Sequence, residues 1–298
     1  MDYGATPLNC SQAQWYGLES FVGGVSNGII GVAAMKYLNP FTKAFSFQKV
    51  WFFLDADTQY VMIVNLTSRT NASVYSVLDQ RRHSGAIYVN NDTFNAPGNQ
   101  NFDGTVSSLW HGGVGYVFES GSTTLRLSVG GHTGAWSAIG TSTQPNTTVD
   151  LFAAWIRHQN LTQPTAYATF PGTTLESFRS KSRNREIVPL QNDAHISAVL
   201  DARYSTVSAV FWDEYGGTLP LGNVTLGGCG PAIITVSGNV ALMLDLKNGT
   251  LTVSDPSQTL TSVVVQVVGM KEIPVTSTLN LPSGGLAGSS VTTKLLEL

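Results

Sequence analysis

Residues 47–54 read FQKVWFFL and residues 60–64 read YVMIV, with the polar stretch Asp55-Ala56-Asp57-Thr58 between them. Two apolar runs of strand length, joined by a short polar turn, predict a β-hairpin whose strands are covered on both faces. Further strand-like stretches follow at regular spacing, with Gly, Asn and Pro between them, which is typical of an all-β sandwich. These stretches are 74–78, 86–89, 114–118, 125–129, 149–156 and 166–170.

The middle of the chain predicts a short helix and a domain junction. Thr173-Thr174-Leu175-Glu176 has the form of a capping box, which indicates the start of a connector helix. Four cationic residues lie between Arg179 and Arg185 in a polar stretch that ends at Pro189, as expected for a junction. From Ile187 onward we predict a second antiparallel meander, with strands at 206–212, 232–236, 240–246, 251–253 and 262–268.

Composition excludes several classes of protein. Of the 298 residues, 12% are charged and 42% are hydrophobic, so the chain can build a sizeable core and is not disordered. Its apolar runs are interrupted within about ten residues, too short to span a membrane. The net charge of -3 lacks the broad basic field of a nucleic-acid-binding protein.

Glycosylation acceptor sequences favour an extracellular protein. The pattern Asn-x-Ser/Thr occurs at about twice its chance frequency, although Asn-rich turns also produce it by accident. No signal peptide can be read at Met1. Cys10 and Cys229 permit either one disulfide or two free thiols. The acceptors are Asn9, Asn65, Asn71, Asn91, Asn146, Asn160, Asn223 and Asn248.

Few motifs indicate catalysis or metal binding. Gly24 to Gly28 matches the G-x-S-x-G nucleophile elbow around Ser26, but the following residues have β rather than helical character. The five histidines lack zinc-site spacing, Asp55-x-Asp57 reads as a turn rather than a calcium loop, and no phosphate-binding glycine loop is present. We therefore predict no metal and no cofactor.

Clustered cations are the best candidates for substrate binding. Arg81, Arg82 and His83 are consecutive, and arginine pairs with carboxylates and sulfates of an acidic polysaccharide in bidentate fashion. The alternative is a solvated strand end, and for the cluster from Arg179 to Arg185 a solvated linker. Three tryptophans, Trp110, Trp136 and Trp155, either stack on sugar rings or belong to the core.

An ordered series of motifs resembles polysaccharide lyase family 8, the family of hyaluronate, chondroitin AC and xanthan lyases. The likeness covers nearly the whole chain and looks closest to the fungal branch. It rests on VWFFLD at 50–55, SVLDQRR at 76–82, YVN at 88–90, GYVF at 115–118, GAW at 134–136, YATFP at 167–171 and VLDA at 199–202.

The resemblance implies a large antiparallel super-sandwich domain at residues 1–180 and a smaller antiparallel β domain, similar to a β-sandwich, at residues 181–298. Family members cleave acidic polysaccharides by β-elimination, in which an Asn neutralises the uronate carboxylate and a Tyr removes the C5 proton and protonates the leaving oxygen. Those residues lie on an N-terminal helical toroid domain, which we expect to be missing from this chain. Tyr3, Tyr16 and Asn27 do not match family motif positions, so no catalytic residue is assigned.

Three hypotheses follow. The first is the β-domain portion of a secreted polysaccharide lyase that acts on hyaluronan, chondroitin or xanthan. The second is a non-catalytic secreted module that binds acidic glycans, with Arg81, Arg82 and His83 as the binding residues. The third is a serine esterase that uses Ser26.

Overall fold

The described residues of the chain form four sheets, labelled A to D. The computed structural model describes residues 17–54, 57–94, 100–119, 123–183, 186–225, 231–269 and 274–295. Within this part every strand pair is antiparallel, so the predicted all-β class is confirmed. The single α-helix of these residues, α1, covers Leu175–Arg183.

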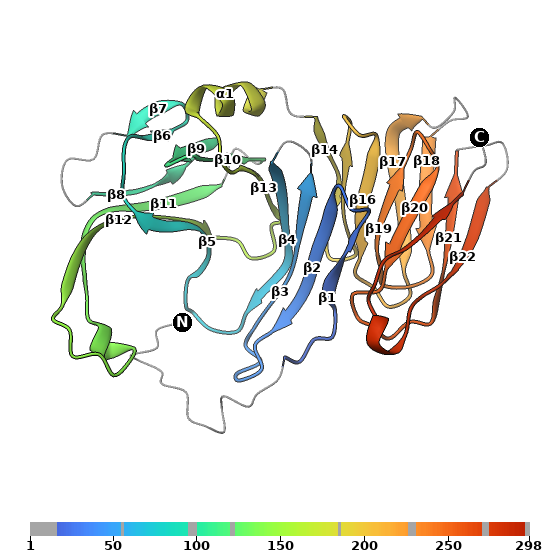
Figure 1. The fold of residues 1–298 in the computed structure, drawn as a ribbon, viewed down its shortest axis with the longest axis horizontal. Helices are drawn as coiled ribbons and strands as arrows, with labels where there is room; N and C mark the ends of the chain where they lie inside the picture. Colours follow the sequence, from blue (N-terminus) through green and yellow to red (C-terminus); the bar gives the residue numbers. More distant parts are fainter. Residues whose placement is uncertain are drawn as a thin grey trace.

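Sheets A and B are built from the first block of the chain (Figure 1). In spatial order, sheet A contains β1 (Val22–Ser26), β2 (Gly31–Leu38), β3 (Phe45–Leu54), β4 (Thr58–Ser68), β13 (Thr165–Phe170), β10 (Val114–Phe118), β9 (Ser108–His111), β6 (Ile87–Val89) and β7 (Asp92–Phe94). Sheet B contains β5 (Val74–Arg82), β12 (Thr147–His158), β11 (Thr124–Gly134) and β8 (Gln100–Thr105).

Sheets C and D are built from the second block. Sheet C contains β14 (Ile187–Asn192), β15 (Ile196–Asp201), β16 (Thr206–Phe211), β19 (Ala241–Asp245), β20 (Thr250–Ser254) and β23 (Val291–Lys294). Sheet D contains β17 (Gly217–Thr225), β18 (Pro231–Val236), β21 (Ser262–Val268) and β22 (Val275–Asn280). The two sheets confirm the second domain that the resemblance implies, an antiparallel domain similar to a β-sandwich. They differ from a simple meander, because the chain alternates between two sheets that bury their apolar faces against each other.

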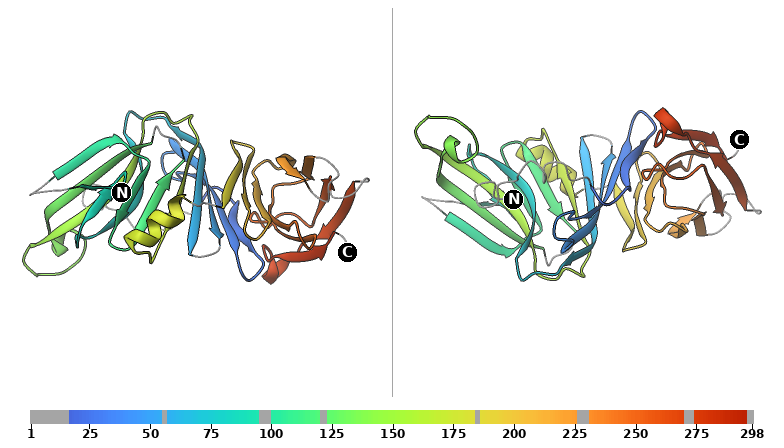
Figure 2. Two further views of the ribbon diagram at one scale, coloured as in Figure 1. Left: turned by 90° about the horizontal axis from the view of Figure 1, so that it is seen from above. Right: turned by 90° about the horizontal axis from the view of Figure 1, so that it is seen from below.

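The sheets are stacked in the order B, A, C, D (Figures 1 and 2), and the described residues form three hydrophobic cores between them. Phe152 of β12 and Val61 of β4 belong to the core between sheets B and A. Phe52 of β3 and Val210 of β16 share the core between sheets A and C, and a third core fills the space between sheets C and D. The two blocks of the chain thus share one core.

The predicted hairpin is formed by β3 and β4. Residues 60–64 of β4 are all buried, because sheets B and C lie on either side of this strand. β3 differs from the prediction, because only its even-numbered residues are buried, while Phe53 is 46% exposed. The prediction that both faces are covered is therefore correct for β4 but not for β3.

Helix α1 confirms the predicted connector helix, but its N-terminal cap lies one residue later than predicted. The Ser177 amide donates a hydrogen bond to Thr174 Oγ1 at 3.2 Å, so Thr174 rather than Thr173 caps the helix. Arg179, Lys181 and Arg183 lie on this helix and not on a linker. Among the described residues no helix has the length and apolar character of a membrane span.

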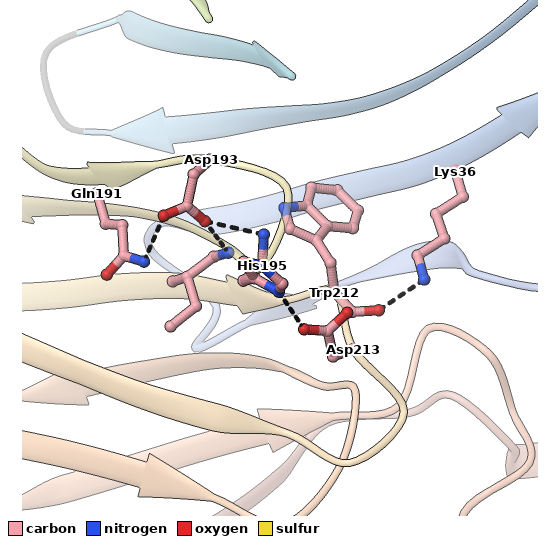
Figure 3. A network of polar contacts seen from close by, with 7 residues as sticks. Lys36, Gln191, Asp193, His195, Trp212 and Asp213 are labelled. Carbon is pink, nitrogen blue, oxygen red and sulfur yellow. Dashed lines mark hydrogen bonds and ion pairs between the residues drawn. The ribbon is translucent and has the colours of Figure 1, made fainter. Parts of the chain in front are cut away.

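Polar contacts add to the shared core where the two blocks meet. Lys36 of β2 donates a hydrogen bond from Nζ to the Trp212 carbonyl at 2.6 Å, and Ser254 of β20 donates one to the Gly24 carbonyl at 2.9 Å. Figure 3 shows the first contact beside the His195–Asp213 pair, whose Nδ1 and Oδ2 atoms are 2.5 Å apart. Sheets A and C are therefore joined by directional bonds as well as by apolar packing.

Candidate glycan-binding groove

The three predicted binding residues lie at the end of β5 but do not form one site. Arg82 pairs with Leu151 of β12, and Arg81 pairs with the fully buried Phe152. Successive residues of a strand point to opposite faces. Arg81 therefore points toward sheet A, while Arg82 lies on the outer face of sheet B.

Arg81 is occupied by contacts within the protein. Its Nε is 2.9 Å from Asp79 Oδ1 and its Nη2 is 2.5 Å from Asp79 Oδ2. Its Nη1 donates to the Gly112 carbonyl at 3.0 Å. The hydrogen bonds to Asp79 raise the pKa of the guanidinium above its usual value. Arg81 thus ties β5 to the turn between β9 and β10.

His83 is also held by neighbouring side chains. Its Nδ1 is 3.0 Å from Asp150 Oδ2, and its ring stacks on His111 with centroids 5.6 Å apart. His111 is buried against Phe152, and its pKa is lowered to about 4 by burial first, then by the charges of His83 and Arg81. This cluster packs sheet B onto sheet A.

Arg82 instead opens into a groove of about 450 Å³ on the outer face of sheet B. After β11 the chain forms a short 3-10 turn at Trp136–Ala138, which brings the indole of Trp136 to the groove. Trp136 is 55% exposed and Ile139 is 65% exposed. His132, Thr133, Gly134, Ala135, Thr147, Val149 and Leu151 complete the lining.

The groove combines two kinds of recognition. Arg82 forms no ion pair with any described carboxylate and is exposed, so its guanidinium is free to pair with an anion. The exposed indole of Trp136 offers a flat apolar surface in the same groove. An anionic sugar presents both a carboxylate or sulfate and an apolar ring face, so this groove fits an acidic saccharide.

The sequence indicated Arg82 and Trp136 separately but not the groove they form. His132 pairs with Val149, and Arg82 pairs with Leu151, so the register of three strands brings these residues together. Because successive side chains of a strand alternate between its two faces, the sequence could have indicated that Arg82 points away from Arg81. That these residues bind substrate stays a prediction.

Three of the other candidates, Arg179, Trp110 and Trp155, make contacts within the protein. Arg179 donates from Nη2 to the Asn91 carbonyl at 2.9 Å and lies over the Tyr88 ring at 5.5 Å. Trp110 donates from Nε1 to the Thr173 carbonyl at 3.2 Å. Trp155 lies on the outer face of sheet B, edge-on to a neighbouring tyrosine. Arg185 lies outside the described residues.

Ser26 does not lie on a nucleophile elbow. It ends β1, and the chain turns directly into β2 rather than into a helix. Its Oγ donates to the Ile30 carbonyl and accepts from the Gly28 amide, each at 3.0 Å. Both contacts stabilise the hairpin turn, so the esterase hypothesis loses its structural basis.

No metal site is found in the part of the chain that the structure describes, where no three His, Cys, Asp or Glu side chains come together. Asp57 has a φ of 58°, which is a turn conformation. Cys10, Cys229 and Asp55 lie outside the described residues, so the pairing of the cysteines stays open.

Comparisons with known proteins place the chain in a family. Residues 1–182 match the model of the polysaccharide lyase family 8 super-sandwich domain, and residues 190–264 match that of the family's C-terminal β-sandwich domain. A search of curated proteins found no match.

Solved lyase structures share the fold. A chondroitinase AC lyase superimposes with a TM-score of 0.78 at 22% identity, covering 92% of this chain and 40% of that chain. A Paenibacillus xanthan lyase gives 0.77 at 19% identity, covering 92% and 28%. The chondroitin AC lyase of Streptomyces coelicolor A3 gives 0.64 at 22% identity, covering 83% and 30%.

This chain thus spans less than half the length of these structural relatives. The expected likeness to the fungal branch stays a prediction. The first family model alone covers more than half of the chain, and the matched residues contain the motifs that first indicated the resemblance. The chain belongs to polysaccharide lyase family 8.

Proposed function

We propose that the chain is the β-domain portion of a secreted lyase that cleaves acidic, uronate-containing polysaccharides by β-elimination. In this reaction a base takes the C5 proton, the bond from C4 to the leaving oxygen breaks, a C4–C5 double bond forms, and the leaving oxygen is protonated. We assign none of these proton transfers to this chain. A helical domain, as in the family's full enzymes, would supply them.

The observation that supports an acidic substrate is the groove that both Arg82 and Trp136 line. Two of the structural relatives are chondroitin-cleaving lyases, one of them solved in complex with chondroitin sulphate, and a third is a xanthan lyase. In this proposal Arg82 pairs with a carboxylate or sulfate, and Trp136 stacks on the adjoining sugar.

Binding measurements test the groove. Replacing Arg82 by Gln, or Trp136 by Ala, is expected to weaken binding of a chondroitin or hyaluronan oligosaccharide about tenfold, as for loss of one charged hydrogen-bond partner. Arg69→Gln is the matched control, because Arg69 is exposed, lies away from the groove and removes the same charge. Equal affinities for all three variants and the wild type would contradict the proposed groove.

A second candidate function is a non-catalytic glycan-binding module, which the same groove favours. Incubation with hyaluronan, chondroitin or xanthan separates the two, because elimination leaves an ultraviolet-absorbing unsaturated end. We expect no product from this chain alone and product once a helical catalytic domain is joined to it. Product from this chain alone would show that our assignment of catalysis to another domain is wrong, and no product from the joined protein would favour the binding module.

Secretion is part of the proposal and has support of its own. Six acceptor asparagines are exposed in the described residues, namely Asn65, Asn71, Asn91, Asn146, Asn160 and Asn248. Exposure is what attachment of a bulky glycan requires. Expression in a eukaryotic secretory host should give a mass that falls on treatment with an N-glycosidase. An unchanged mass would count against a secreted glycoprotein.

A further inference from the structure

Half of one face of sheet A is uncovered among the described residues. Val50 and Phe52 of β3 are fully buried toward sheet C, whereas the alternating residues of the same strand face the other side. The core between sheets A and B takes its buried residues on the sheet A side from β4, β6, β9, β10, β13 and the loop preceding β9, and none from β1, β2 or β3. Among the residues of β1, β2 and β3, only the partly buried Trp51 packs against this core. Sheet B therefore reaches Trp51 but leaves the neighbouring residues of β2 and β3 on this face half-exposed.

Aromatic rings line this uncovered half. Tyr37 of β2 stacks on Phe47 of β3 with centroids 5.0 Å apart and an interplanar angle of 21°. Phe45 lies 5.7 Å from Phe47, and Phe53 at the far end of β3 is 46% exposed. We call the surface formed by Tyr37, Phe45, Phe47, Lys49 and Trp51 the β3 platform.

Lys49 is the cation of the platform. Its Nζ lies 4.7 Å from the centroid of the Trp51 ring, and it forms no ion pair with any described carboxylate. Burial lowers the pKa of the ammonium, because a charged group loses water without gaining a counter-ion. An anionic ligand would supply the missing partner.

Hydrogen-bonding groups lie two strands away from Lys49. In sheet A, Lys49 pairs with Ile63, which in turn pairs with Thr165. The hydroxyl of Thr165 is 3.5 Å from Nδ1 of His158, whose Nε2 is 2.7 Å from the hydroxyl of Ser76. Burial, and then the charge of Lys49, lowers the pKa of His158 to about 4, so the imidazole is neutral near pH 7. The charge of Lys49 therefore acts on His158 of β12, which is itself hydrogen-bonded to Thr165 and Ser76.

We propose that the β3 platform is a second saccharide-binding surface, where Lys49 pairs with a carboxylate or sulfate of an acidic glycan and the aromatic rings stack on its sugars. This inference rests on the proposed acidic substrate but concerns a different surface. The groove of Arg82 lies on the outer face of sheet B, whereas the platform lies on the face of sheet A that is turned toward sheet B.

Calorimetric titration of the whole chain with size-defined oligosaccharides tests the platform. In the Arg82→Gln background, which removes the groove's cation, Lys49→Met should weaken binding about tenfold or more. Lys49→Arg, which keeps the charge, should stay within about threefold of the parent. Unsulfated and sulfated chondroitin serve as separate arms, because the two share the same sugars and the second adds sulfates. Stronger binding of the second that is lost in Lys49→Met assigns the sulfate to Lys49.

Nuclear magnetic resonance shows whether the oligosaccharide binds at the β3 platform. Oligosaccharide should shift the indole N–H signal of Trp51 in the wild type and in Arg82→Gln, but not in Lys49→Met. Loss of binding in Arg82→Gln with unchanged Trp51 signals would overturn the platform and leave the groove intact. Equal shifts with a neutral oligosaccharide would overturn the role of Lys49. A Trp51 shift that depends only on protein concentration, with dimers seen by sedimentation, would identify the platform as a contact between copies and overturn the proposal.

Discussion

The ring of Phe178 in helix α1 lies directly over Gly115 of β10, and a Cβ atom at position 115 would overlap it. Phe178 is buried and contacts Phe170 edge-to-face, with centroids 5.8 Å apart. The glycine therefore leaves the space in which the helix seats on sheet A. Gly115 also belongs to one of the motifs that indicated the family.

Gly115→Ala should lower the free energy of unfolding by about 1–3 kcal/mol, the usual cost of overpacking a core. Urea denaturation measures this. Gly134→Ala is the control, since no atom lies within 4 Å of its Cβ position, and it should change the stability by less than about 0.5 kcal/mol. An equal loss in both variants would show that overlap with Phe178 is not the cause.

Substitution of Asp255 should reduce the folding stability more than substitution of most other polar residues. It is 2% exposed. Its Oδ1 accepts from the Ser257 amide at 2.7 Å, and its Oδ2 accepts from the amides of Thr259 and Leu260 at 2.6 and 2.7 Å. Asp255→Ala leaves these donors unpaired and should cost about 3 kcal/mol or more, because each buried unsatisfied group costs about 1–3 kcal/mol.

The control for Asp255 is Asp245→Ala. Asp245 accepts from the amides of Lys247 and Asn248 in the same manner, at 2.8 and 3.0 Å, but in an exposed turn. Water replaces the lost acceptor there, so we expect a loss below about 1 kcal/mol. Thermal melting of both variants compares them, and similar losses would contradict the importance of burial.

Lys36→Met should loosen the contact between sheets A and C. The ammonium donates to the Trp212 carbonyl (Figure 3) and lies 5.6 Å from the Phe21 ring centroid. A hydrogen bond from a charged donor is worth about 1.5–3 kcal/mol. Hydrogen exchange should rise for the Trp212 amide, which donates to the His195 carbonyl. Lys247→Met at an exposed turn should leave that exchange unchanged.

Stability should fall as the solution becomes acidic. The pKa values of His111 and His158 are lowered to about 4 in the folded protein, from the ordinary value of 6.5. Between these values the unfolded chain binds more protons, so the free energy of unfolding decreases as the pH falls from 6.5 toward 4. The slope is up to about 1.4 kcal/mol per pH unit for each imidazole.

Denaturation at several pH values measures this slope. His111→Gln should reduce it, because the variant lacks the buried imidazole, whereas the exposed His132→Gln should keep it. An unchanged slope in His111→Gln would mean that His111 does not contribute. The charged neighbours Arg81, Asp79 and His83 stay in place in both variants.

The sequence predicts strands well where apolar and β-branched residues stand between turn residues. The bounds of β10 and β21 agree with the prediction for this reason. β1, with the sequence VGGVS, was not predicted, because its glycines resemble a turn and tertiary packing makes it a strand. The polar strands β22 and β23 were missed because both lie at sheet edges, where one side needs no apolar partner.

The site was less predictable than the fold. Arg81, Arg82 and His83 form one group in the sequence, but strand alternation sends Arg82 away from the other two. The groove depends on the pairing of β5 with β12, which includes a register shift at Ala154 and Trp155. A bulge of this kind leaves no mark in the residue pattern, so the position of Trp136 relative to Arg82 required the structure.

The core between sheets A and C has a consequence for how the two family domains unfold. Val50 and Phe52 come from the first domain and Val210 and Trp212 from the second, and all four are fully buried in the same cluster. Excising either domain would expose this apolar surface to water. We therefore expect the two family domains to unfold as one cooperative unit, which should melt in a single transition and should not be divided for expression.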